Sequence, residues 1–205
     1  MNNTITSLVL QDSLSYEAYI NFTKEIIAST HPPEIYRDEK MMNYTKDNLA
    51  RMQDLNENIE IEPKLYNQLQ LNTTPWTWVC ITEPWCGDAS QIVPILYFIS
   101  KCSDLISFKI LLRDNHTDVM DNYLTKGGRS IPKLVCLKSE DLSEVGRWGP
   151  RPKVLQDIVT EKLKDPNMSF GEKVRMVHQW YSEDKTTSTQ IEFIDIINNW
   201  RNTPQ

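Results

Sequence analysis

Cysteine and histidine are scarce in this sequence, and neither is spaced for a disulfide framework or a metal site. The 205 residues include four cysteines and three histidines. Small secreted folds need a much denser set of paired cysteines, and zinc sites need closely spaced ligands. We therefore expect no metal and no cofactor, and we interpret Cys80, Cys102 and Cys136 as buried thiols that pack as small hydrophobes.

Long apolar runs and clusters of positive charge are also missing. No stretch approaches the roughly 18 apolar residues of a membrane span, and the first residues lack the basic start of a signal peptide. The formal net charge is −6, and no basic run alternates with aromatic residues as nucleic-acid binding would favour. We expect a cytoplasmic protein that binds neither nucleic acid nor membranes.

One stretch, residues 76–91, combines a strand, a turn and a helix around a cysteine. Residues 76–81 are mostly apolar and follow a proline, which predicts a buried strand. Beyond the turn at Cys86, apolar residues recur at helical spacing: Ile92, Ile95, Leu96 and Ile99. Free N–H groups and the dipole at a helix N-terminus stabilise a thiolate. We therefore expect Cys86 to face solvent with a lowered pKa and to act as a nucleophile.

The order of a strand, the motif Trp-Cys-Gly-X and a helix resembles the active-site segment of the thioredoxin superfamily. Pro94 matches the proline that kinks the family's active-site helix, and Ser130-Ile131-Pro132 matches its cis-proline before a strand. WCGD followed by RDNHTDVMDNYLTKGGRSIPKL is similar to a bacterial thioredoxin-like subgroup. The resemblance implies an α/β fold with a central mixed sheet flanked by helices. It also implies thiol-disulfide exchange with protein thiols or a low-molecular-weight thiol.

The second cysteine of the family's Cys-X-X-Cys motif is missing, because Ala89 stands in its place. A dithiol cycle needs one thiolate to attack and a second to resolve the mixed disulfide. The leading hypothesis is therefore a monothiol protein, in which Cys86 forms mixed disulfides that an external thiol releases. The alternative is a non-catalytic module whose groove binds an extended peptide. A third is peroxide sensing through a Cys86 sulfenic acid resolved between subunits, although the oligomeric state is left open.

The resemblance also implies a substrate-binding groove around Cys86. In it, the backbone of Ile131, before Pro132, would pair with an extended substrate. The expected groove residues are Trp85, Gly87, Ile131, Pro132, Trp148 and Gly149.

Charged residues near this groove are candidates to modulate the thiol. Glu83 is either a solvated loop carboxylate, which we favour, or a substitute for a buried acid common in thioredoxins. Asp88 is expected to cap the helix rather than to relay a proton. Arg129, with Arg147 and Arg151, either supplies positive potential to the thiolate or is a surface charge.

Three segments organise the chain, and we expect them to form one compact domain. Residues 1–71 are a helical N-terminal extension, 72–164 the thioredoxin-like core, and 165–205 a C-terminal helical extension. Periodicity predicts helices over residues 16–27, 44–55, 118–124, 154–163, 171–183 and 190–200, with another from Pro63. Strands are predicted over residues 108–112, 133–138 and 144–148 in addition to the one before Cys86.

Overall fold

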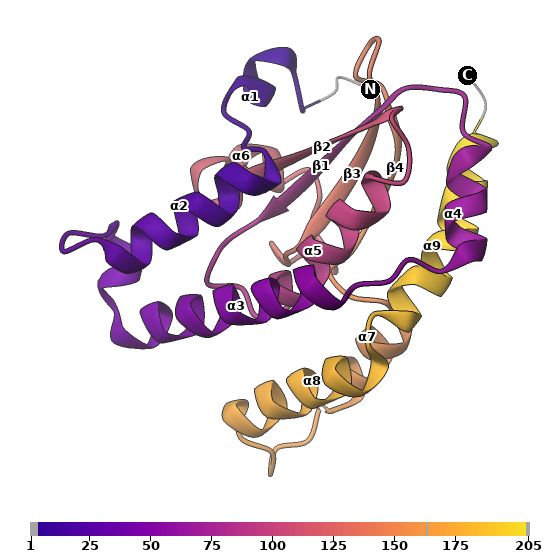
Figure 1. Ribbon diagram of the computed structural model, residues 1–205. Coiled ribbons are helices and arrows are strands. Elements are labelled where there is room, and N and C mark those ends of the chain that lie inside the picture. The colour runs from indigo at the N-terminus through magenta and orange to yellow at the C-terminus, as the bar shows by residue number, and fades with distance from the viewer. Residues whose placement is uncertain (1–3, 163, 204–205) are drawn as a thin grey trace.

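A four-stranded mixed sheet forms the centre of the computed structural model, which describes residues 4–162 and 164–203 (Figure 1). The strands are β1 (Trp76–Thr82), β2 (Ile106–Leu112), β3 (Lys133–Lys138) and β4 (Glu144–Trp148), in the order β2-β1-β3-β4. β1 runs parallel to β2 and antiparallel to β3, and β3 pairs antiparallel with β4. Every residue of β1 is buried, as in a strand covered on both faces. The α/β fold is thus confirmed.

The N-terminal segment forms helices whose contacts reach the sheet, the helix after Cys86 and the last helix of the chain. They are α1 (Ser7–Gln11), α2 (Tyr16–Ala28), the short η1 (Glu34–Arg37), α3 (Glu39–Asn58) and α4 (Pro63–Gln70). α3 packs on α5 (Ala89–Ser100). It begins earlier than the predicted 44–55 because the Asp38 side chain accepts a hydrogen bond from the Met41 N–H and caps the helix.

The elements after α5 largely agree with the sequence pattern in type and order, although several begin or end a few residues from the predicted bounds. η2 (Arg113–Asn115) follows β2, and α6 (Thr117–Met120) is shorter than the predicted 118–124. The chain leaves α6 and makes a tight turn in which Lys126 and Gly127 have positive φ and Thr125 bridges to Gly128. α7 (Lys153–Lys162) matches the prediction, whose last residue, 163, lies outside the described residues.

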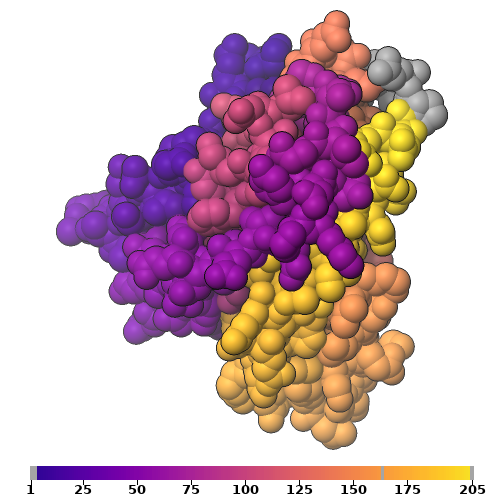
Figure 2. Space-filling model, turned by 45° about the vertical axis from the view of Figure 1, so that its right-hand side comes forward, coloured from indigo at the N-terminus to yellow at the C-terminus, as the bar shows by residue number. Residues whose placement is uncertain are grey.

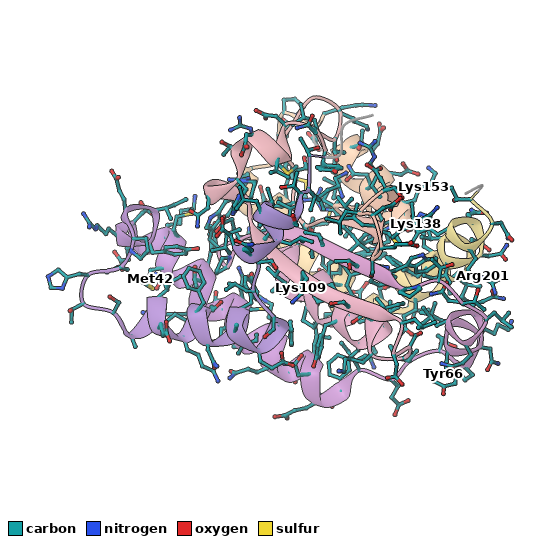
Figure 3. All side chains as sticks on the ribbon, turned by 90° about the horizontal axis from the view of Figure 1, so that it is seen from above. Met42, Tyr66, Lys109, Lys138, Lys153 and Arg201 are labelled. Carbon is teal, nitrogen blue, oxygen red and sulfur yellow. The ribbon has the colours of Figure 1, made fainter. Side chains whose placement is uncertain are left out.

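Two further helices, α8 (Phe170–Asp184) and α9 (Thr187–Arg201), complete the chain. α9 lies beside α4, and Figure 2 shows the yellow C-terminal residues against the magenta ones of α4. Figure 3 shows Tyr66 and Arg201 on these neighbouring helices. Arg201 donates a hydrogen bond to Gln68. Aromatic side chains of α9 pack on the sheet, with Trp200 5.9 Å from Trp78 between ring centroids.

In the part of the chain described, no helix is both long and apolar enough to cross a membrane.

Candidate functional site

Cys86 lies in the short loop between β1 and α5, as the sequence predicted. Its N–H donates to the Glu83 carbonyl (3.1 Å), which closes the turn. Its Sγ donates to the carbonyl of Ile131 (3.4 Å), and the peptide bond between Ile131 and Pro132 is cis. The fold therefore brings the thiol to residues more than forty positions away in sequence.

Burial changes the chemistry that we expected of this thiol. Cys86 is only 7% exposed, and burial raises its pKa to about 12. The Asp88 carboxylate also raises this pKa, whereas the backbone N–H groups of Ala89 and Asp88, with the Arg151 guanidinium, lower it. The prediction of a solvent-facing, low-pKa thiolate is therefore wrong, because desolvation outweighs the helix N-terminus. The thiol is protonated at neutral pH.

Asp88 belongs to a buried polar network instead of capping α5. It occupies the N-cap position, but its side chain accepts no capping hydrogen bond. Both carboxylate oxygens bind Arg151, at 2.7 and 2.6 Å, and the Tyr181 hydroxyl donates to one of them (3.0 Å). A bidentate pair of this kind fixes both partners. The pair also offsets the positive charge of the Arg151 guanidinium, which lowers the pKa of Cys86.

Glu83 is buried rather than solvated, so our favoured interpretation of it is wrong. It is 4% exposed and accepts hydrogen bonds from the Asp114 N–H (2.7 Å) and the Tyr36 hydroxyl (3.4 Å). Burial raises the pKa of Glu83 to about 7, although the Asp114 N–H and the Arg113 guanidinium lower it. This carboxyl group therefore titrates near neutral pH, and it lies three residues before Cys86 in the sequence.

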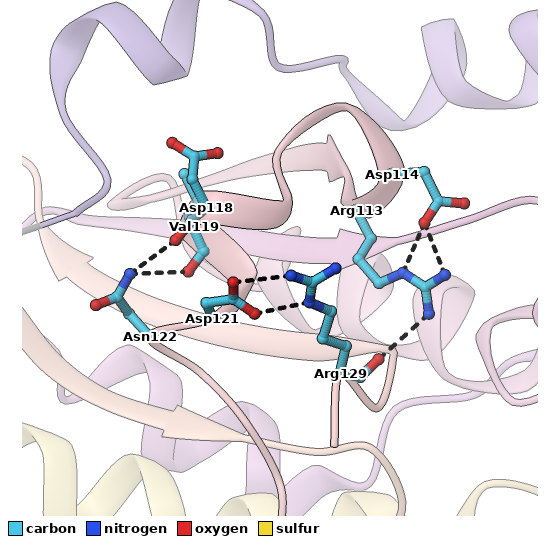
Figure 4. A network of polar contacts seen from close by, with 7 residues as sticks. All are labelled: Arg113, Asp114, Asp118, Val119, Asp121, Asn122 and Arg129. Carbon is cyan, nitrogen blue, oxygen red and sulfur yellow. Dashed lines mark hydrogen bonds and ion pairs between the residues drawn. The ribbon is translucent and has the colours of Figure 1, made fainter. Parts of the chain in front are cut away.

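Arg129 does not modulate the thiol, because its guanidinium is held elsewhere. It binds both carboxylate oxygens of Asp121, at 2.6 and 2.8 Å (Figure 4). The neighbouring Arg113 lies over the ring of Trp85, 4.8 Å from its centroid. Arg151, which we had named with Arg129 and Arg147 as either a source of positive potential or a surface charge, lowers the pKa of Cys86.

Trp148 and Gly149 support the cis-proline loop but do not line an open groove. Trp148 is 7% exposed, and its ring lies 5.1 Å from Phe193 of α9. Gly149 has φ +112°, and a Cβ at this position would lie 2.4 Å from the Pro132 carbonyl oxygen. Only glycine fits there. Arg147 pairs with Glu144 (2.9 Å), so it is a surface charge.

A cavity of about 370 Å³ opens onto Cys86. The cysteine loop forms its floor, while α3 and α8 form facing walls. The wall residues are mainly apolar or aromatic and include Met41, Tyr44, Trp85, Val159, Phe170, Val174 and Val177, with Asn48, Gly87 and His178 nearest the loop. The N-terminal and C-terminal extensions therefore both contribute to the site.

Direct contacts hold these two helices on the loop. The Asn48 amide of α3 donates to the Pro84 carbonyl (2.9 Å). His178 of α8 approaches Gly87 so closely that a Cβ there would lie 3.2 Å from the imidazole. Sequence reasoning missed Asn48 and His178 because an amphipathic stripe indicates which face is buried, not what it covers.

Comparison with known proteins places this arrangement in a family. A family model described as Thioredoxin matches residues 35–164, which is more than half of the chain. The chain belongs to this thioredoxin family. No match was found among curated proteins.

Two solved structures share the thioredoxin-like fold across nearly the whole chain. One is a protein of unknown function from Pseudomonas aeruginosa, with a TM-score of 0.59 and 15% identity, covering 95% of this chain and 98% of that one. The other is an HIV epitope scaffold, with a TM-score of 0.53 and 15% identity, covering 95% and 94%. At this identity the likeness shows the fold alone.

The loop between β1 and α5 contains one cysteine, Cys86, whose pKa burial raises to about 12. Ala89 is buried in the position of a resolving cysteine. Among the described residues, no group of three or more His, Cys, Asp or Glu side chains is placed to hold a metal ion.

Proposed function

We propose that this thioredoxin-family protein binds a small molecule in the cavity above Cys86 and does not catalyse dithiol exchange. The observation that carries this proposal is the half-open cavity that borders the cysteine loop. The loop that is expected to be exposed in a thiol-exchange protein instead forms the floor of a cavity walled by α3 and α8. Its volume of about 370 Å³ lies within the ~300–1,000 Å³ that is typical of small-molecule sites.

A small molecule fits this site better than an extended peptide does. Peptide binding at the cis-proline would require the Ile131 backbone to be accessible for strand pairing. Ile131 is only 6% exposed, Pro132 is buried, and the Ile131 carbonyl already accepts the hydrogen bond from Cys86. A peptide would have to displace this contact.

The state of the thiol also argues against rapid exchange. With a pKa of about 12, roughly one Cys86 side chain in 10⁵ is ionised at pH 7. Exchange requires the thiolate, and its rate falls with the ionised fraction. A protonated thiol serves better as an apolar wall atom than as a nucleophile.

The test is a thermal-shift screen of small molecules, repeated on a variant whose cavity is filled. Val177→Trp places an indole in the cavity, and Val154→Trp is the matched control because Val154 is exposed on α7. We expect stabilising compounds to lose their effect in Val177→Trp and to keep it in Val154→Trp. Compounds that stabilise all three proteins equally would contradict a site in this cavity.

The second candidate function is monothiol exchange with small disulfides that enter the cavity. Its support is the geometry at Sγ, which faces the N–H groups of Asp88 and Ala89 and borders the cavity. The Cys86 thiolate would attack a low-molecular-weight disulfide, forming a mixed disulfide and releasing one thiolate, which takes up the proton that Cys86 lost. An external thiol would then reverse the step.

Intact-mass spectrometry after incubation with glutathione disulfide separates the two candidates. The binding proposal expects adduct formation at Cys86 to be much slower than at a free cysteine. A rapid adduct that disappears in Cys86→Ser would favour exchange instead.

A further inference from the structure

The walls of the cavity above Cys86 are mainly apolar, with a few charged side chains among them. The apolar wall residues come from α3 and α8 and include Met41, Tyr44, Val174 and Val177. The charged residues in the lining are Lys40, Asp88, Arg151 and Lys173. The class of ligand that fits therefore depends on whether any of these charges is free to meet a charge on the ligand.

Asp88 and Arg151 compensate each other beside the cysteine loop. The two carboxylate oxygens accept hydrogen bonds from the Arg151 guanidinium, at 2.7 and 2.6 Å, and the Tyr181 hydroxyl donates to the same carboxylate (3.0 Å). A ligand charge that bound either partner would have to break this bidentate pair and leave the other charge buried without a partner. The pair therefore presents no free charge to the cavity.

The two lysines are also engaged by the protein. Lys173, in the first turn of α8, donates to the Asp165 carbonyl (3.2 Å). The Lys40 ammonium lies 5.8 Å from the ring centroid of Tyr44 and 5.4 Å from that of Phe170, which is cation–π distance. Lys40 and Phe170 are both exposed, so this charge lies in contact with water. An ion pair with such an exposed lysine contributes little to binding.

The neutral polar side chains nearest the cysteine loop have partners as well. The Asn48 amide nitrogen donates to the Pro84 carbonyl (2.9 Å), and its oxygen accepts from the Arg51 guanidinium (3.0 Å). The Cys86 thiol donates to the Ile131 carbonyl (3.4 Å), and it is uncharged at neutral pH. The floor of the cavity therefore carries no charge for a ligand to bind.

His178 is uncharged at neutral pH too. Burial lowers its pKa, and the Arg51 guanidinium acts in the same direction, whereas the Asp88 and Asp47 carboxylates raise it. Its Nδ1 is a buried atom with no hydrogen-bond partner among the described residues. The imidazole therefore contributes a neutral ring, packed close to Gly87, to the wall.

These contacts favour a ligand without charge. An ion that moved between the apolar walls would lose hydration and meet no free counter-charge, and this desolvation costs far more than a contact with exposed Lys40 would return. An uncharged molecule incurs no such cost. Its apolar surface gains free energy as it leaves water for the walls.

We propose that the ligand of this cavity is an uncharged, largely apolar molecule of low molecular weight. It lies between α3 and α8, with Met41 and Val177 on its sides and the neutral thiol of Cys86 at the floor. This inference rests on the proposed function and names the chemical class of the ligand for the same cavity.

The test compares three probes that share one ring system and differ in the charge of a single substituent. They are 1-naphthalenemethanol, which is neutral, 1-naphthoate, which is an anion, and 1-naphthalenemethylammonium, which is a cation. Isothermal titration calorimetry at neutral pH measures their binding. We expect the alcohol to bind with one-to-one stoichiometry and about tenfold more tightly than either ion.

Met41→Gln tests the apolar wall, and Met42→Gln is its matched control. Glutamine is similar to methionine in length and helix propensity but adds a polar amide. Met41 lines the cavity, whereas Met42 (Figure 3), the next residue of α3 and likewise half-buried, is not among the lining residues. We expect Met41→Gln to weaken binding of the alcohol about fivefold and Met42→Gln to leave it unchanged.

Failure of the alcohol to bind would overturn the inference, as would naphthoate or the ammonium probe binding as tightly as the alcohol. Equal effects of the two methionine substitutions would also contradict it. These results leave the cavity itself in place, because its own test is the loss of screened compounds in Val177→Trp. A second copy of the chain seated on the cavity would contradict the inference too. Size-exclusion chromatography would then show a dimer that Met41→Gln, but not Met42→Gln, dissociates.

Discussion

Replacing Glu83 with glutamine is expected to remove a pH dependence of stability that wild type shows between about pH 4.5 and 7. Burial raises the pKa of Glu83 from 4.5 to about 7, so the folded protein favours the protonated carboxyl group. Glutamine stays neutral and retains one oxygen, which can accept from the Asp114 N–H, while its amide nitrogen replaces the oxygen that accepts from the Tyr36 hydroxyl.

The sign and size of the effect follow from linkage. Because the folded-state pKa lies above the unfolded one, the contribution of Glu83 is fully present below pH 4.5 and is lost as pH rises through about 7. The two pKa values differ by about 2.5, and each pKa unit corresponds to about 1.4 kcal/mol. The difference therefore amounts to roughly 3 kcal/mol of unfolding free energy. The new amide donor of glutamine costs about 1 kcal/mol or more if it stays unpaired.

Urea unfolding from pH 4.5 to 8 measures this contribution. Other groups titrate in the same range, so the relevant quantity is the difference in unfolding free energy between wild type and Glu83→Gln at each pH. We expect that difference to shift in favour of the variant by roughly 3 kcal/mol as pH rises. Glu57→Gln, on the exposed side of α3, is the control. A difference that does not vary with pH would refute the burial argument.

Two further substitutions test the thiol and the aromatic packing. Asp88→Asn should lower the pKa of Cys86, because it removes a carboxylate that raises this pKa and leaves its guanidinium partner unpaired. Alkylation of the Cys86 peptide by iodoacetamide, followed by mass spectrometry, should then be about tenfold faster or more. Gly146→Ala should lower the unfolding free energy by about 1–3 kcal/mol, because the new Cβ would lie 2.0 Å from Nε1 of Trp200. Thermal unfolding measures it.

Each of these variants has a matched control. Asp121→Asn frees Arg129 in the same way, but far from the thiol, and should leave alkylation unchanged. Gly128→Ala meets no atom closer than 3.6 Å and should cost little stability. Unchanged alkylation in Asp88→Asn, or equal stability of the two alanine variants, would contradict the assigned contacts.

The core elements were predictable because their sequence patterns are local. A mostly apolar run gives the seven-residue strand β1, and the helical stripe after the cysteine gives α5. β3 and β4 were predicted with their observed ends, since polar and turn residues bound both strands. The family resemblance then correctly connected Cys86 with Ile131 and Pro132 across the fold.

The character of the site was not predictable, because it depends on residues that come together only in three dimensions. A helix N-terminus suggests an ionised thiol when the loop is open to water. Here α3 and α8 cover the loop, and desolvation reverses the expectation. The burial of Glu83 and the pairing of Asp88 with Arg151 have the same origin, since each needs a partner that is distant in sequence.

The most direct test of this account is the titration of Cys86, followed by the ultraviolet absorbance of the thiolate and compared with a Cys86→Ser control. The account predicts that Cys86 stays protonated through the neutral range, with a pKa of about 12, well above its ordinary value of 9.0. A pKa below 7 would contradict it. The site would then be open to solvent, and thiol exchange rather than ligand binding would be the function to pursue.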